Sequence, residues 1–152
     1  MVIKSLLFVF TISLVILTSC ARTCAWQYQE MLSAAPAYKA AQLTFVPENT
    51  FTGIGIQLMK GEAGTSGFFN VYSRQLSSAE GTLWINGQPV YFKGTLLAGG
   101  QRLRLPEAVT QAIIQSLLKN DEVIASLPGY STQLISDNFS DQYHKLKPSN
   151  ER

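Results

Sequence analysis

The chain has 152 residues, of which 14% are charged, and its formal net charge at neutral pH is +2. This near balance of charge gives no basic surface field, so we expect no nucleic-acid partner. One histidine and two cysteines are too few for a zinc site of the common kind, and we expect neither a metal nor another cofactor.

The first residues have the pattern of a cleaved export signal. Lys4 supplies one positive charge, and the apolar run from Ser5 to Leu17 spans about 13 residues, whereas a membrane-spanning helix needs roughly 17 to 25. The run closes on Leu17-Thr18-Ser19-Cys20, which resembles the lipobox of bacterial lipoproteins. The resemblance implies that residues 1–19 are a signal peptide removed on export, and that Cys20 becomes the acylated first residue of the mature chain. The alternative is an ordinary secretory signal, or an N-terminal anchor with a buried cysteine.

The residue after Cys20 bears on the destination. In lipoproteins of this kind an aspartate at that position commonly retains the protein in the inner membrane, and here the residue is Ala21. The resemblance therefore implies a lipid anchor in the outer membrane, with the domain facing the periplasm or the cell exterior. Acylation of Cys20 would leave Cys24 as a free thiol or as a bridge to another chain, whereas a disulfide between the two cysteines would exclude lipidation.

Residues 20–42 are expected to form a lipidated tether with a short helical arm. The sequence from Trp26 to Leu32 suits one or two helical turns, and Pro36 should interrupt them. Trp26 and Tyr28 would then lie at the level of the lipid headgroups, where amphipathic aromatic rings are favoured. The alternative is a helix packed loosely on the domain.

Residues 43–147 are expected to form one domain, followed by a tail over residues 148–152. From Leu43 the pattern changes to strands separated by turns. Asn86-Gly87 marks the clearest hairpin, because this dipeptide suits the positive φ angles of a two-residue turn. The expected strands are 53–58 and 68–73 around a glycine-rich connector, Gly61–Gly67; 82–85 and 90–93 around Asn86-Gly87; Arg102–Leu105; and 123–127 and 130–135 across Pro128-Gly129.

Helical periodicity is confined to the last third of the chain. Pro106 suits a first helical position and Glu107 suits the positive end of the helix dipole, so we expect the main helix over about 106–119. A short C-terminal helix should present Phe139, Tyr143 and Leu146 on one side. The expected fold is α+β, with a small antiparallel sheet or an open barrel or sandwich of five to seven strands.

A candidate binding surface follows from the strand after the second hairpin. Arg102 and Arg104 alternate along it, so both guanidinium groups should point the same way, about 7 Å apart. Such a pair suits an acidic partner, an anionic glycan or a lipid headgroup. Trp84, Tyr91 and Lys93 of the neighbouring hairpin extend the surface. The alternative is a solvated outer face on which the arginines protect the sheet from edge pairing.

The sequence contains no complete catalytic set. His144 is the one histidine, and no nucleophile-elbow spacing accompanies it. Gly53-Ile54-Gly55 lacks the third glycine of a dinucleotide fingerprint, and Gly61–Gly67 lacks the ending that cradles phosphate. We therefore expect no enzyme, but a binding or assembly module with the membrane and an envelope protein as partners.

The order of elements also resembles that of the pilot lipoproteins of secretion-system secretins, in which a lipidated cysteine and a short arm precede a strand-rich domain with a late helix. Residues 69–73 and the helix Ile113–Leu118 carry this resemblance. It implies an apolar groove that receives a partner's terminal helix or a lipid. Two alternatives stay open: an envelope hydrolase that uses a serine and His144, and an inhibitor of an external enzyme that presents Gly61–Gly67 as a loop.

Overall fold

The computed structural model describes residues 26–32 and 39–146. The predicted signal peptide, Cys20, Ala21, Cys24 and the predicted tail lie outside these residues. Within the two described ranges, no helix is both long and apolar enough to cross a membrane. In chain order the elements are β1 (Trp26–Leu32), β2 (Lys39–Phe45), β3 (Gly55–Gly61), β4 (Gly64–Asn70), β5 (Glu80–Ile85), β6 (Gln88–Lys93), β7 (Thr95–Leu96), β8 (Arg102–Arg104), α2 (Glu107–Leu118), β9 (Val123–Leu127), β10 (Tyr130–Leu134) and α3 (Phe139–Leu146).

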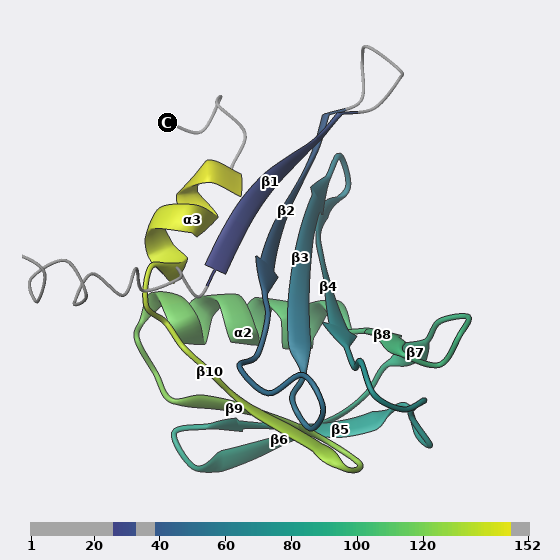
Figure 1. Cartoon of the computed structure of the whole chain (residues 1–152). Helices are drawn as coiled ribbons and strands as arrows, with labels where there is room; N and C mark the ends of the chain where they lie inside the picture. Colours follow the sequence, from purple (N-terminus) through teal and green to yellow (C-terminus); the bar gives the residue numbers. More distant parts are fainter. Residues whose placement is uncertain (1–25, 33–38, 147–152) are drawn as a thin grey trace, which may run out of the picture.

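The strands form two open sheets in which all neighbours are antiparallel (Figure 1). The six-stranded sheet has the order β1-β2-β3-β4-β8-β7, and the four-stranded sheet has the order β10-β9-β5-β6. The predicted α+β class with antiparallel strands is confirmed. The prediction of five to seven strands is wrong, because the described residues form ten strands.

The predicted helical arm is wrong, because Trp26–Leu32 is the strand β1 and pairs along its length with β2. Trp26 is 0% exposed, and its ring centroid lies 5.2 Å from that of Phe45 and 4.8 Å from that of Phe139. Its Nε1 donates a hydrogen bond of 2.7 Å to the carbonyl oxygen of Ile135. These contacts with distant residues outweigh the local helical preference. Trp26 is thus a core residue and does not lie among lipid headgroups.

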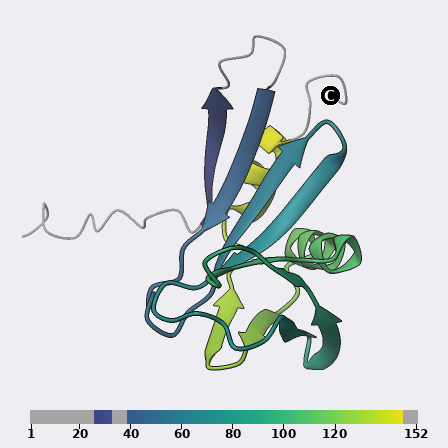
Figure 2. The same cartoon turned by 90° about the vertical axis from the view of Figure 1, so that its right-hand side faces the viewer.

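The helices cover the inner face of the six-stranded sheet. Helix α2 contacts β4, and α3 contacts β1 and β2, as Figures 1 and 2 show. Pro106 is the N-cap residue of α2, so the helix begins one residue later than predicted. A Cβ on Gly67 would lie 2.6 Å from Thr110 Oγ1, so the close approach of α2 to β4 requires glycine there.

Phe139, Tyr143 and Leu146 hold α3 against the sheet, as predicted. Phe139 and Leu146 are buried, and the ring of Tyr143 stacks on that of Phe139 at 5.5 Å. Tyr28, which the arm prediction assigned to the membrane surface, is half-buried and packs against the core. One core unites the two sheets and the helices, with Leu43, Ile56, Phe69, Leu83, Phe92, Leu103, Ile113 and Leu117 among its members.

Two of the predicted turns are confirmed and one is displaced. Asn86 and Gly87 have φ angles of 48° and 78° between β5 and β6, as a two-residue hairpin of the primed type requires. Pro128 and Gly129 join β9 to β10. The predicted connector Gly61–Gly67 is instead part of a longer hairpin in which Gly61 pairs with Gly64, so this segment is not a loop.

The chain passes between the sheets at Gly94, which lies between β6 of the four-stranded sheet and β7 of the six-stranded sheet. A Cβ on Gly94 would lie 2.5 Å from the carbonyl oxygen of Arg104, so only glycine fits at this crossing. Tyr130 ties the sheets together on the other side. Its hydroxyl accepts from the Arg74 amide at 2.9 Å and donates to the Arg74 carbonyl at 3.0 Å.

Candidate functional site

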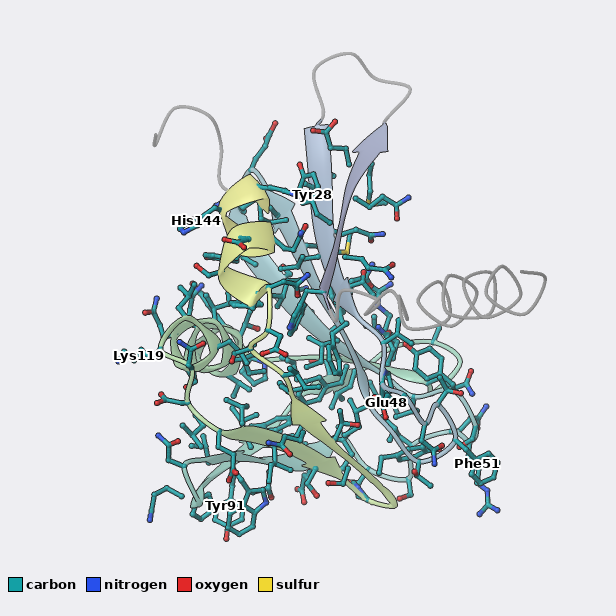
Figure 3. All side chains as sticks on the ribbon, turned by 60° about the vertical axis from the view of Figure 1, so that its left-hand side comes forward. Tyr28, Glu48, Phe51, Tyr91, Lys119 and His144 are labelled. Atoms are coloured by element: carbon teal, nitrogen blue, oxygen red, sulfur yellow. The ribbon has the colours of Figure 1, made fainter. Side chains whose placement is uncertain are left out.

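The outer face of the four-stranded sheet carries three of the predicted surface residues. Leu83 and Phe92 point into the core, so the alternation of the strands turns Trp84, Tyr91 and Lys93 outward. Tyr91 is 76% exposed, and Figure 3 shows it pointing away from the body of the domain. Trp84 is 38% exposed on the same face. An aromatic surface with one cation at its margin results.

A hollow of about 560 Å³ lies in this face beside Tyr91. Lys93 and Glu80, which face each other across β5 and β6, line it together with Thr82 and Ser126. The hydroxyl groups, the phenol and the two charged groups offer hydrogen bonds of both polarities around one aromatic ring. Thr82 and Ser126 were missed in the sequence because these paired residues of β5 and β9 are 44 residues apart in the chain. The signal that could have found them is a polar residue at each outward position of the two strands.

A second hollow, of about 410 Å³, joins Lys93 to Arg104 although the two residues belong to different sheets. The crossing at Gly94 causes this juxtaposition, because β7 follows it at once and pairs with β8. Glu107, in the first turn of α2, also lines the hollow. No ion pair of Lys93 or Arg104 occurs within residues 26–32 and 39–146. The two cations are therefore open to an anionic group brought in from outside.

Arg102 lies two residues from Arg104 but is engaged within its own sheet. Its guanidinium lies 4.0 Å from the ring centroid of Phe68, and its Nη2 donates a 2.7 Å hydrogen bond to Gln57 Oε1. Its Nε is buried and has no hydrogen-bond partner among the described residues. The predicted arginine pair thus divides into a half-buried structural residue, Arg102, and an exposed one, Arg104, which alone faces Lys93.

A third hollow, of about 540 Å³, lies beside α2 at the β3–β4 hairpin. Its lining includes apolar side chains such as Met59 and Phe68, but also the charged side chains of Lys60, Glu62, Arg104 and Glu107. The lining is mixed in character, unlike the apolar groove implied by the resemblance to secretin pilots.

His144 lies on the exposed side of α3 (Figure 3). The Oγ atom of Ser140, one turn earlier, is 3.5 Å from its Nε2. Both residues are exposed, and neither lines any of the three hollows. In the described part of the chain, no three His, Cys, Asp or Glu side chains gather where they could hold a metal ion.

Comparison of the chain with models of protein families, with curated proteins and with solved structures finds no match.

Proposed function

We propose that this protein is a lipid-anchored binding module of the bacterial envelope, acting without catalysis. The observation that carries the proposal is the spacing between the lipobox cysteine and the domain. Only residues 21–25 separate Cys20 from Trp26, which is fully buried in the first strand. Since an extended residue spans at most about 3.6 Å, an acyl group on Cys20 would keep the domain within roughly 20 Å of the bilayer. A module so held acts next to the membrane surface.

The second part of the proposal assigns an acidic ligand to the face that carries Tyr91, Lys93 and Arg104. Lys93 lines both the 560 Å³ and the 410 Å³ hollows, so one ligand can contact the phenol ring and both cations at once. Charged donors form the stronger hydrogen bonds to anionic oxygens, and a guanidinium can bind them in a bidentate manner. The ligand is thus an anionic group on a chain or surface that also packs against an aromatic ring.

The anchor is tested by fractionation of cells that express the full chain. Wild-type protein should sediment with the outer membrane and incorporate labelled fatty acid, whereas Cys20→Ala should lose the label and no longer sediment with the outer membrane. Cys24→Ala is the matched control and should behave as wild type. Equal labelling of wild type and Cys20→Ala would refute the anchor.

The ligand surface is tested with the double variant Lys93→Ser/Arg104→Ser. Hydrogen bonds to charged groups contribute about 1.5 to 3 kcal/mol each, so binding to an acidic probe should weaken roughly tenfold or more. Heparin serves as the acidic glycan probe, and vesicles with anionic or zwitterionic headgroups distinguish a lipid source. Arg74→Ser/Lys119→Ser removes the same charges from exposed positions outside the three hollows. Equal loss in both double variants would contradict the assignment.

A further inference from the structure

Three large apolar side chains are exposed on two neighbouring segments of the domain. Val46 is 52% exposed, Phe51 is 65% exposed and Tyr72 is 44% exposed. Val46 and Phe51 belong to the loop between β2 and β3, and Tyr72 belongs to the segment that follows β4. We call these three residues the apolar patch.

Contacts between the two segments bring the members of the apolar patch together. Ser73, the neighbour of Tyr72, donates a 2.7 Å hydrogen bond from its Oγ to the carbonyl oxygen of Phe51. The ring of Tyr72 lies over Gly55, where a Cβ would be 3.0 Å from the Tyr72 Cζ. Val46 adjoins Gly55, because these two residues lie directly beyond the last residue pair of β2 and β3. Single exposed apolar residues are ordinary on a protein surface, but a group of them indicates a contact surface.

The loop that carries Val46 and Phe51 is held in a fixed shape. Asn49 Oδ1 accepts hydrogen bonds from the backbone N–H groups of Phe51 at 2.9 Å and Thr52 at 3.3 Å. The carbonyl oxygen of Thr52 accepts from the Ser131 N–H at 3.1 Å, which ties the loop to β10. Because the loop is ordered in advance, burial of its apolar side chains against another surface costs little conformational entropy.

The apolar patch lies beside the residue from which the chain continues towards Cys20. Trp26 pairs with Phe45, which directly precedes Val46. Since strands lie about 4.8 Å apart and rise about 3.4 Å per residue, the Cα atoms of Trp26 and Val46 are roughly 6 Å apart. Figure 2 shows the start of β1 and the loop after β2 on the same side of the domain. Residues 21–25 span at most roughly 20 Å, so a lipid on Cys20 brings this side close to the bilayer.

Phe51 is the most exposed member of the apolar patch, and few charges surround it. It projects from the side of the domain opposite Lys119 (Figure 3). The loop after β2 has one charged residue, Glu48, and the segment between β4 and β5 also has one, Arg74. Both are exposed and their charges are opposite. The charge of lipid headgroups therefore gives no net attraction here, and burial of apolar surface must supply the binding.

We propose that the apolar patch inserts into the lipid bilayer beside the anchor and thereby fixes the orientation of the domain. The inference rests on the lipid anchor of the proposed function. Phe51 enters the boundary between headgroups and acyl chains, about 5 to 10 Å deep, and Tyr72 lies among the headgroups, where a ring with one polar group is favoured. Tyr91 points in another direction in Figure 3, so this orientation leaves the surface of Tyr91, Lys93 and Arg104 free for its ligand.

Quenching of tryptophan fluorescence by brominated lipids tests the insertion. The purified lipidated protein, in a Trp84→Phe background, is added to vesicles of phosphatidylethanolamine and phosphatidylglycerol with or without bromine on their acyl chains. Phe51→Trp should be quenched several-fold more than Lys119→Trp, the matched control on the opposite side. Trp26 is buried in both variants and adds the same background. The quenching should persist in about 1 M salt, because charges are then screened beyond about 3 Å whereas apolar contact is kept.

Three results would overturn the proposal. The first is equal quenching of Phe51→Trp and Lys119→Trp in protein that floats with the vesicles and whose thermal unfolding matches wild type; the anchor would stand and the insertion would not. The second is quenching of Phe51→Trp that disappears in high salt, since charged groups would then make the contact. The third is a mature chain whose mass shows no lipid on Cys20, which would remove the anchor and this orientation together. Failure of the insertion alone is thus distinguished from failure of the anchor.

Discussion

Trp26 provides the sharpest test of the fold, because the structure and the helical-arm hypothesis assign it opposite environments. Truncation of a buried tryptophan to alanine costs about 3 to 5 kcal/mol in core packing. The change also leaves the Ile135 carbonyl without the 2.7 Å donor Nε1, which adds about 1 kcal/mol. Trp26→Ala should therefore lower the free energy of unfolding by about 5 kcal/mol, which is comparable with the whole stability of a small domain.

Urea denaturation of the mature chain, made unlipidated by Cys20→Ala, measures this cost. Trp26→Phe keeps an aromatic ring against Phe139 but removes the indole N–H, so it should cost only about 1 to 2 kcal/mol. Trp84→Ala is the matched control; because Trp84 is 38% exposed on the outer face, its loss should cost less than about 1 kcal/mol. Equal destabilisation by Trp26→Ala and Trp84→Ala would refute the burial of Trp26 in the core of the domain.

Three further predictions concern the packing of the sheets and helices. Gly67→Ala should lower the free energy of unfolding by about 1 to 3 kcal/mol, because the new Cβ meets Thr110 Oγ1 at 2.6 Å. In urea denaturation, the double variant Gly67→Ala/Thr110→Ala should lose less stability than the sum of the two single variants. Tyr130→Phe removes the hydroxyl that binds both backbone groups of Arg74 and should cost about 1 to 3 kcal/mol by the same assay; unchanged stability would contradict the bridging role. Burial raises the pKa of Tyr72 above its ordinary value of 10.0, so its stabilising contribution is complete below that pH and is lost as the pH rises through the folded-state pKa. Tyr72→Phe should reduce the alkaline loss of stability in pH-dependent denaturation, and an identical alkaline profile would exclude this contribution.

The elements whose signals are local were predicted well from the sequence. Asn86-Gly87 specifies its own turn, since it is one of the few dipeptides that accept positive φ at both positions. The apolar stripe through Val109, Ile113 and Leu117 likewise specifies a helix, because its period is that of the buried face.

The strand β1 could not be predicted in this way, because its structure depends on residues far along the chain. Trp26 donates a hydrogen bond to Ile135 and exchanges hydrogen bonds with Asn138, and these two residues follow it by 109 and 112 residues. The glycine-rich hairpin was misplaced for a related reason. Gly67 resembles a loop residue locally, but the approach of Thr110 from α2 is what requires glycine at this point of a strand.

The sequence identified most residues of the candidate surface, but it did not predict how they are arranged in space. Lys93 and Arg104 were both named from their outward positions in strands, and the structure brings them to one hollow. Lys93 and Arg104 come together because the chain crosses between the sheets at Gly94, and nothing in the sequence distinguishes this glycine from the others. Arg102 does not join this hollow, because its guanidinium binds Gln57 and stacks on Phe68, which belong to two other strands.

The most direct test of the proposed function is the mass of the N-terminal peptide of the mature protein isolated from membranes. A lipid-anchored module predicts a peptide that begins at Cys20 and carries a diacylglycerol thioether together with an amide-linked acyl chain. The same peptide from Cys24→Ala should carry the same lipid. A mature chain that begins elsewhere, or an unmodified Cys20 in membrane-bound protein, would contradict the anchor and the function proposed from it.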